Sequence, residues 1–165
     1  MKRIELTQGM FAIVDEEDFE KINSLKWCYE KHGKQDYANK AIRVGKKQRS
    51  VRMHQMILNC PQGYEIDHIN GCGLDNQRKN LRIVNRMQNN WNSRKRRKAT
   101  SRYKGVSFSK RDKKWKVQIL SDSRYYSMGL FETEMGAALA YNDLAFKLRG
   151  EYARLNNIYG HNRKN

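Results

Sequence analysis

The sequence predicts an α+β protein built from a β-rich N-terminal module and a small C-terminal domain, in which a three-stranded antiparallel sheet packs on one helix. Short runs that alternate apolar and polar residues recur between polar turns, as half-buried strands do. The stretch 132–150 instead repeats its apolar residues at helical spacing. Between the two parts, residues 93–104 carry seven cations and no acid, and such a run does not fold alone.

The first 60 residues contain several short elements. Residues 15–25 are amphipathic, and their acidic start suits the positive end of a helix dipole. Phe19, Ile22 and Leu25 recur at helical spacing and are predicted core residues. The strand-like runs of this module are RIEL (3–6), MFAIV (10–14), YANKAIRV (37–44) and SVRM (50–53).

Residues 64–92 predict a strand, an irregular loop, a second strand and a helix. YEID and LRIV are the strand-like segments, and Asn85 is placed to cap a helix through RMQNNWN. Within the loop, Gly71 and Gly73 are expected to allow positive φ. Asp75 and Asn76 are expected to make local turn bonds.

The last part of the chain predicts three strands followed by a helix. GVSFSK, KWKVQIL and RYYSMGLF are separated by turn residues, and the helix begins after Thr133 as N-cap and ends at Gly150. The basic run marks the boundary between the two parts. The predicted organisation is a first domain over 1–92, a linker over 93–102, a second domain over 103–157 and a tail over 158–165.

Charge restricts the classes of partner. The 165 residues carry a net charge of +17, and residues 93–165 hold more of it (18 basic and 6 acidic, 18 − 6 = +12) than residues 1–92 (16 − 11 = +5). Such an excess favours a polyanionic partner, above all nucleic acid, while the alternative is a basic surface kept for solubility. No apolar run is long enough to span a membrane, and no secretory signal follows the first residue, so an intracellular, cytoplasmic protein is expected.

The three cysteines support the same compartment. Cys28, Cys60 and Cys72 are odd in number and never form a C-x-x-C pair, so they resemble neither a zinc knuckle nor a disulfide framework. Reduced structural thiols are therefore expected.

The stretch 64–92 carries the groups that phosphodiester hydrolysis requires. A hard divalent cation needs oxygen ligands, the attacking water needs a base near neutral pH, and that base needs a partner that fixes its tautomer. Asp67 and an amide oxygen can hold the metal, His68 can be the base, and a second amide can orient it. From these residues alone, a structural Asp-His pair remains the alternative.

The pattern IDH-x-NG…DN…NLR…N-x-x-N resembles the HNH, or ββα-metal, motif of phage and intron homing endonucleases. The intervals from His68 to Asn80 (12 residues) and from Asn80 to Asn89 (9 residues) match it. The resemblance implies His68 as general base, Asn80 orienting its ring, and Asp67 with Asn89 as ligands of Mg²⁺, for which Mn²⁺ would substitute. Asn89 stands where the motif's name has a final His, as in several phage members. His54 is expected to be structural, with a phosphate contact as the minority interpretation.

Residues 103–157 resemble the plant Apetala-two/ethylene-response-factor DNA-binding domain. The matched elements are Y-K-G-V at the start, K-W-x-V-x-I, MGLF, AA-x-AY and the closing A-x-LN. The resemblance implies that the three-stranded sheet lies in the major groove of duplex DNA and that the helix supports it from behind. Ser107, Gln118 and Ser127 depart from the plant pattern, so its target sequence does not transfer.

The linker and the sheet supply the predicted DNA contacts, because phosphate contacts give affinity and base-edge contacts give sequence preference. The expected DNA-binding residues are Arg94, Lys95, Arg96, Arg97, Lys98, Lys104, Lys110, Arg111, Lys114, Trp115, Lys116, Gln118, Arg124 and Tyr126.

The composition and the residues of 64–92 predict a nucleic-acid binder with an oxygen-ligand site. The resemblance to the HNH family implies the reaction, a metal-dependent homing-type DNA endonuclease that leaves 5′-phosphate and 3′-hydroxyl ends. One site per chain predicts a nick from a monomer on DNA, or a double-strand break from a dimer or from two sequential cuts. The enzyme could be phage-encoded and act in a host cell. The alternatives are a non-catalytic, sequence-specific DNA-binding regulator and an RNA-binding or structural protein.

Binding to duplex DNA is expected to depend steeply on salt. Each neutralised phosphate adds about −0.9 to the slope of log K against log salt concentration, so contacts with six or more phosphates give a slope steeper than about −5. A salt titration of binding measures this slope. A nearly flat titration would contradict the predicted basic interface.

Overall fold

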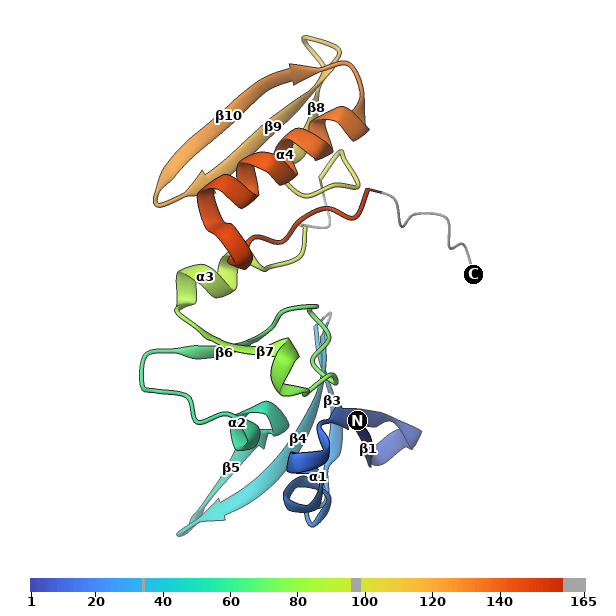
Figure 1. Cartoon of the computed structure of the whole chain (residues 1–165), viewed down its shortest axis with the longest axis vertical. Helices are drawn as coiled ribbons and strands as arrows, with labels where there is room; N and C mark the ends of the chain where they lie inside the picture. Colours follow the sequence, from blue (N-terminus) through green and yellow to red (C-terminus); the bar gives the residue numbers. More distant parts are fainter. Residues whose placement is uncertain (34, 96–98, 159–165) are drawn as a thin grey trace. The chain divides into compact units, whose positions relative to one another are not determined.

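The computed structural model describes residues 1–33, 35–95 and 99–158. The chain divides into two compact units, Met1–Asn89 and Asn90–Asn165, and each is described by itself. Both combine small antiparallel sheets with helices, which confirms the predicted α+β class (Figure 1). Within the described ranges, no helix is both long and apolar enough to cross a lipid bilayer.

The N-terminal unit is built from three small antiparallel sheets. Strand β1 pairs with β2, β4 lies between β3 and β5, and β6 pairs with β7. Its strands and helices are β1 (Lys2–Glu5), β2 (Phe11–Val14), α1 (Glu16–Asn23), β3 (Cys28–His32), β4 (Gln35–Val44), β5 (Lys47–Arg52), α2 (Met53–Ile57), β6 (Glu65–His68), β7 (Leu81–Val84) and α3 (Arg86–Trp91), the last of which ends beyond this unit. Two short 3-10 turns, η1 (Thr7–Gly9) and η2 (Arg78–Asn80), precede β2 and β7.

One apolar core lies beneath these sheets. It contains Ile22 from α1, as the helical spacing predicts, with Phe19 and Leu25 packed against it. The indole of Trp27 is buried in the same core and donates a hydrogen bond to the carbonyl of Ile22 at 2.9 Å, so its polar edge is satisfied. The other buried members are Ile4, Leu6, Ala12, Val14, Ala38, Met53, Ile57 and Leu81.

The irregular loop between β6 and β7 is tied to the start of the chain. The amide of Ile13 on β2 donates to the carbonyl of Leu74, and the carbonyl of Ile13 accepts from the amide of Asn76, both at 2.8 Å. Arg78 also donates through two guanidinium nitrogens to the carboxylate of Asp18 on α1, at 2.8 and 2.9 Å. These bonds give the loop, whose only regular element is the short turn η2, a defined path.

A second anchor comes from Asp15, the residue before α1. Its carboxylate accepts from the backbone amide of Arg78 at 2.7 Å and from the side-chain amide of Gln77 at 3.1 Å. The hydrogen bond from the Arg78 amide is the main reason that the pKa of Asp15 is lowered, and the bond to Asp18 is the main reason that the pKa of Arg78 is raised.

The structure adds two elements that the sequence pattern did not predict. Strand β3 lacks a clear alternation, and helix α2 has only five residues, too few for a periodic signal. Asn85 does cap α3, because its side chain accepts from the amide of Gln88 while the Gln88 side chain accepts from the amide of Asn85, both at 2.9 Å.

The two loop glycines serve different purposes. Gly71 has φ +72, as expected. The expectation of positive φ at Gly73 is wrong, because this residue is needed for space. A Cβ there would lie 2.3 Å from the carbonyl oxygen of Asp36 and 2.7 Å from the ring of Tyr37. The loop therefore packs directly on β4.

The C-terminal unit has the predicted sheet and helix. Strands β8 (Val106–Ser109), β9 (Lys114–Ser121) and β10 (Arg124–Phe131) form a meander with β9 in the centre, and α4 (Glu134–Arg149) contacts all three strands (Figure 1). Thr133 caps α4 by accepting from the amide of Gly136 at 3.0 Å, and Gly150 ends the helix with φ +54 before the 3-10 turn η3 (Gly150–Tyr152). The core holds Tyr103, Val106, Val117, Ile119, Ala137, Ala138, Tyr141 and Ala145.

Gly105 is expected to be indispensable for the C-terminal unit. It has φ +73, and an added Cβ would lie 2.1 Å from the buried ring of Tyr141. We expect Gly105→Ala to lower the free energy of unfolding by more than about 3 kcal/mol, because left-handed strain of about 1–2 kcal/mol adds to a steric clash in the core. Thermal unfolding followed by circular dichroism measures the loss.

Gly129→Ala is the matched control for this substitution. Gly129 has φ +88, but nothing lies within 4 Å of an added Cβ, so only the backbone strain of about 1–2 kcal/mol remains. Equal destabilisation by the two substitutions would show that the contact with Tyr141 is unimportant.

Candidate functional site

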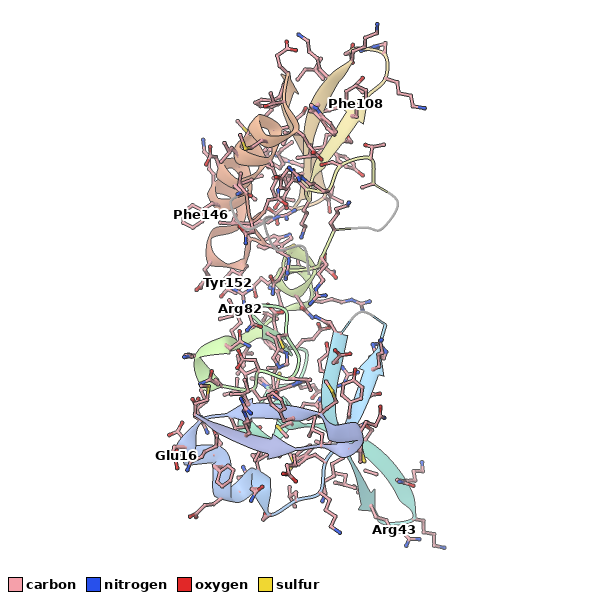
Figure 2. All side chains as sticks on the ribbon, turned by 90° about the vertical axis from the view of Figure 1, so that its right-hand side faces the viewer. Glu16, Arg43, Arg82, Phe108, Phe146 and Tyr152 are labelled. Atoms are coloured by element: carbon pink, nitrogen blue, oxygen red, sulfur yellow. The ribbon has the colours of Figure 1, made fainter. Side chains whose placement is uncertain are left out.

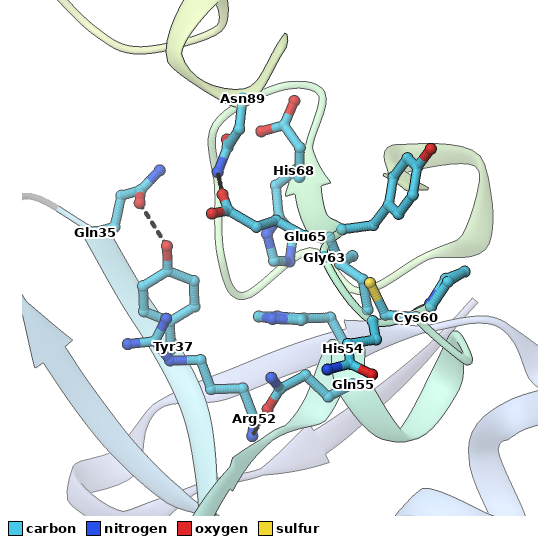
Figure 3. Close-up of a pocket in the computed structure, with 15 residues that line it drawn as sticks. Gln35, Tyr37, Arg52, His54, Gln55, Cys60, Gly63, Glu65, His68 and Asn89 are labelled. Carbon is cyan, nitrogen blue, oxygen red and sulfur yellow. Dashed lines mark hydrogen bonds between the residues drawn. The ribbon is translucent and has the colours of Figure 1, made fainter. Parts of the chain in front are cut away.

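A polar cavity of about 440 Å³ lies in the N-terminal unit beside strand β6 (Figure 3). Strands β4, β5 and β6, helix α2, the segment after α2 and helix α3 all contribute to it. It brings together Asp67, His68 and Asn89, three of the four predicted catalytic and metal-ligating residues. The full lining is Gln35, Tyr37, Arg52, His54, Gln55, Cys60, Pro61, Gln62, Gly63, Tyr64, Glu65, Ile66, Asp67, His68 and Asn89.

His68 is the last residue of β6 and is buried. Its Nε2 lies 3.1 Å from Oδ1 of Asn76, which the anchored loop holds beneath the ring. Burial is the main cause that lowers the pKa of His68, while the hydrogen bond to Asn76 and the charge of Asp67 oppose it. The side-chain nitrogen of Asn76 is buried and has no hydrogen-bond partner among the described residues, so this amide interacts with the imidazole through its oxygen.

The side chain of Asn80 forms its hydrogen bonds with the loop, so the predicted orientation of the His68 ring by Asn80 would act through the loop. Its Oδ1 accepts from the amide of Asn70 at 3.0 Å, and its Nδ2 donates to the carbonyl of Asp75 at 2.7 Å. Its backbone carbonyl accepts from the amide of Ile69, the residue after His68. Asn80 therefore holds the two ends of the loop together, while the side-chain oxygen of Asn76 lies at hydrogen-bonding distance from the His68 ring.

A second imidazole lies against the first. The ring centroid of His54 on α2 is 4.9 Å from that of His68, with an angle of 81° between the rings. Tyr37 on β4 lies beside both imidazoles, with its ring centroid 5.9 Å from that of His54 and 6.1 Å from that of His68. Burial, followed by the charges of His68 and Arg52, lowers the pKa of His54 to about 3, so this imidazole is neutral at pH 7.

Asp67 lines the cavity, is buried, and is paired with a cation. Its Oδ2 accepts from Nε and Nη2 of Arg82 at 3.0 and 2.9 Å, across the β6–β7 pair. The two side chains are both largely buried. Arg82 therefore fixes the orientation of the carboxylate and offsets part of its charge.

Asn89 on α3 lies at the same cavity beside Glu65. The side-chain nitrogen of Asn89 donates a hydrogen bond to the Glu65 carboxylate (Figure 3). Glu65 and Asp67 are two residues apart on β6, so they share a face of the strand. Glu65 is a residue that the sequence analysis did not single out, because a carboxylate on a strand edge is ordinarily solvated.

The donor set fits a hard divalent cation. Carboxylate and amide oxygens are the ligands that Mg²⁺ takes from proteins, which often supply only one or two carboxylates and leave other positions to water and phosphate. Among the described residues, no group of three His, Cys, Asp or Glu side chains is close enough to hold a metal by itself. The arrangement therefore fits an incomplete cation site that includes an amide oxygen, and it does not fit a closed structural site.

Other residues that contact His68 carried weak signals in the sequence. His54 had been singled out, but Tyr37 and Asn76 come from distant or irregular segments with no spacing that relates them to His68. Asn76 is one of seven asparagines in residues 64–92, and only the path of the loop distinguishes it.

The outer face of the C-terminal sheet is the candidate nucleic-acid interface. Residues directly opposite each other on paired strands share a face. Val117 and Ile119 are buried under α4, so the residues that alternate with them, Lys116 and Gln118, point away from the helix. The register places Ser107, Ser109, Lys114, Lys116, Gln118, Leu120, Tyr125, Ser127 and Leu130 on this outer face.

Three of the predicted DNA contacts lie on the other face. The register pairs Trp115 with Phe131, Tyr126 with Ile119, and Arg124 with Ser121, all on the helix side. The Trp115 ring packs against Phe108 at 5.1 Å and against the core. The expectation that Trp115, Arg124 and Tyr126 share a face with Gln118 is therefore corrected. The aromatic residue on the outer face is Tyr125, which is 77% exposed.

Lys104 is also placed differently from the expectation. Its ammonium donates to the carbonyls of Trp91 and Ser93, both at 2.6 Å. Burial, followed by the charges of Arg149 and Arg154, lowers its pKa to about 8. Lys104 therefore holds the preceding segment through these two hydrogen bonds.

The remaining predicted contacts occupy turns and the linker. Lys110 and Arg111 lie in the exposed turn between β8 and β9. Arg94 and Lys95 line a small cavity of about 240 Å³ with Arg102 and Arg154. Arg96, Arg97 and Lys98 lie outside the described residues.

Comparison with curated proteins gives three similarities. The chain is 31% identical over 94 residues to Protein 3.8 of Escherichia phage T7, which covers 57% of this chain and 77% of that protein. It is 28% identical over 153 residues to an uncharacterized HNH endonuclease of Acanthamoeba polyphaga mimivirus, which covers 92% of this chain and 77% of that protein.

The third similarity concerns a shorter segment. A segment of 64 residues, 39% of this chain, is 36% identical to an AP2-like ethylene-responsive transcription factor of Arabidopsis thaliana. The similarity covers 13% of that protein. No protein-family model and no solved structure matches the chain.

The buried His54 is expected to make the stability of the N-terminal unit depend on pH. Its pKa is lowered from 6.5 to about 3, so the unfolded chain binds a proton between these values and the native unit does not. The stabilisation is complete above pH 6.5 and is lost as the pH falls. From pH 7 to pH 5, the free energy of unfolding should therefore fall by about 2 kcal/mol more in the wild type than in His54→Leu.

Denaturant unfolding at the two pH values measures this difference. His32→Leu is the matched control, since His32 is exposed, and it should follow the wild type. Parallel pH profiles for the wild type and His54→Leu would contradict the neutral buried state of His54.

Proposed function

The chain belongs to the family of Protein 3.8 of Escherichia phage T7, and from this premise and the histidine cavity we propose that it is a metal-dependent DNA endonuclease of the HNH type. The observation that carries the proposal is the convergence of His68 with Asp67 and Asn89 in one polar cavity. The strand pair β6–β7 and helix α3 have the order of a ββα motif. The name of the mimivirus relative, an HNH endonuclease, supports the same activity.

In this proposal His68 is the general base that takes a proton from the attacking water. Asn76 Oδ1 faces Nε2 of the ring, which assigns the ring proton to Nε2 and the basic lone pair to Nδ1. The burial that lowers the pKa of His68 favours the neutral imidazole, the form that accepts a proton. The edge of His54 limits rotation of the ring.

Asp67 and Asn89 would hold Mg²⁺, or Mn²⁺ in its place, with Glu65 as a further oxygen donor. A bound divalent cation neutralises charge on the scissile phosphate and on the leaving oxygen. Arg82 keeps the Asp67 carboxylate in a fixed orientation, and the Glu65–Asn89 hydrogen bond positions the amide. Hydrolysis on this scheme leaves 5′-phosphate and 3′-hydroxyl ends.

The C-terminal unit would locate the DNA. The similarity of 64 residues of the chain to an AP2-like transcription factor, together with the resemblance of residues 103–157 to the plant DNA-binding domain, supports binding through the sheet. On the outer face, Lys114 and Lys116 would contact phosphates, while Gln118 and Tyr125 would reach base edges. The basic turn with Lys110 and Arg111 and the linker residues would extend the contact along the backbone.

The homing role and the number of strands cut are further parts of the proposal. One histidine cavity per chain gives one nick per bound monomer, and two chains or two sequential events give a double-strand break. A specific observation also favours a second candidate, a DNA-binding regulator, because the plant relative is named as a transcription factor.

Cleavage of long duplex DNA with Mg²⁺ or Mn²⁺ tests the proposal. We expect cleavage by the wild type, none in EDTA, and a rate reduced by about 10²–10⁴-fold in His68→Ala, because a positioned general base contributes that much. His32→Ala is the matched control, since this histidine is exposed on β3 and outside the cavity lining, and it should cleave as the wild type does.

A gel-shift measurement in EDTA accompanies the cleavage assay. His68→Ala should bind DNA as tightly as the wild type, which would show that the variant is folded. Binding without cleavage by the wild type in either metal would overturn the nuclease proposal and favour the regulator.

A further inference from the structure

Strands β4 and β5 continue as a two-stranded ribbon beyond the body of the N-terminal unit. Strand β3 pairs with Gln35–Asn39, and from Lys40 to Val51 no third strand among the described residues pairs with the two. Figure 2 shows Arg43 near the projecting end of this ribbon. Val44 is 51% exposed, and no core residue follows Ala38 on either strand. A two-stranded ribbon without a covering layer is at most marginally stable in water, which raises the question of what it contacts.

The ribbon carries one sign of charge. Residues 38–52 contain six basic residues and no acidic one. Arg52, at the base, lies 3.7 Å from Glu30, whereas the other five make no ion pair with any described residue. The unpaired cations are Lys40, Arg43, Lys46, Lys47 and Arg49. This pattern fits a polyanion and disfavours a protein surface of mixed charge.

One face of the ribbon is continuous with the histidine cavity. Gln35, Tyr37 and Arg52 line the cavity. Alternation along β4 puts Asn39, Ala41 and Arg43 on the same face as Tyr37, and the register adds Ser50 and Gln48 opposite Ala41 and Arg43. A polar track therefore leads from the cavity to the Arg43–Gln48 pair near the end of the ribbon.

We propose that the β4–β5 ribbon is a DNA-binding arm that enters the major groove beside the cleavage site, with the face that bears Arg43 and Gln48 toward the bases. The position beside the cleavage site rests on the proposed nuclease function. The major groove admits a two-stranded ribbon, and Arg and Gln side chains are suited to the edges of guanine and adenine. Lys46 in the turn, Lys47 at the start of β5, and Lys40 and Arg49 on the opposite face contact phosphates.

The length of the arm sets its reach. Seven residues separate Tyr37, at the cavity, from Val44, at the end of β4. At about 3.3 Å per residue this spans about 23 Å, or about seven base pairs at 3.4 Å each. The arm therefore reads sequence up to about seven base pairs to one side of the cut.

Two variants of the full chain separate the two kinds of contact. Lys46→Ala/Lys47→Ala should lower the magnitude of the salt slope of binding by about 1.8, because each lost phosphate contact removes about 0.9. Arg43→Ala/Gln48→Ala should relax base preference within about seven base pairs of the cut in a randomised cleavage library. The matched control is Lys26→Ala/Lys147→Ala, which removes two exposed lysines from outside the ribbon and should leave both quantities unchanged.

Binding is measured in EDTA and circular dichroism confirms folding, so the salt slope does not depend on nuclease activity. If the wild type fails to cleave but the slope still falls for the ribbon variant alone, the arm stands while the nuclease proposal fails. If the wild type cleaves and the ribbon variants match the control in slope and in base preference, the arm is overturned. If the ribbon variant lowers the salt slope of binding to single-stranded RNA and not that of binding to duplex DNA, the proposed DNA-binding arm is also overturned.

Discussion

The backbone bonds of Ile13 hold the irregular loop between β6 and β7, and the histidine cavity depends on them. One residue of an early strand donates to Leu74 and accepts from Asn76, while the Asp18–Arg78 pair fixes the end of the same loop. A loop of this length has no periodic hydrogen bonding to define it, so its path follows from these anchors. Through them, a strand more than fifty residues away positions the amide that meets His68.

The cavity shows how a polar cluster is kept inside a small unit. Two imidazoles, a tyrosine and a carboxylate lie together with limited exposure, and burial of such groups is unfavourable without partners. The neutral state of His54, the Arg82–Asp67 pair and the Asn76–His68 bond each reduce that cost. The buried nitrogen of Asn76 without a partner is the remaining unfavourable feature, and it lies beside the proposed general base, where such features are often functional.

The two units present DNA-facing candidates of the same physical type. In each, an antiparallel sheet or ribbon has one surface that no core covers: the outer face of β8–β10 and the projecting part of β4–β5. Both surfaces combine cations with polar side chains at alternate positions. Their difference lies in support, because α4 backs the C-terminal sheet, whereas the ribbon projects without a third strand.

Much of this protein follows from its sequence because the signals are local. Alternation predicted most of the strands, and the caps at Asn85 and Thr133 predicted where two helices begin. The 12- and 9-residue intervals singled out His68, Asn80 and Asn89, and the fold places His68 and Asn89 with Asp67 in one cavity. The tertiary structure alone decided which asparagine forms the contact with the His68 imidazole. The sequence does not distinguish among the seven asparagines of residues 64–92, and the anchors of the loop direct Asn76 toward the ring and Asn80 toward the loop backbone. It also decided which side of the C-terminal sheet each residue occupies. Successive side chains of a strand point to opposite faces, and the buried core residues fix which face is which. Trp115 and Tyr126 therefore lie on the helix side of the sheet, and Tyr125 lies on the solvent side.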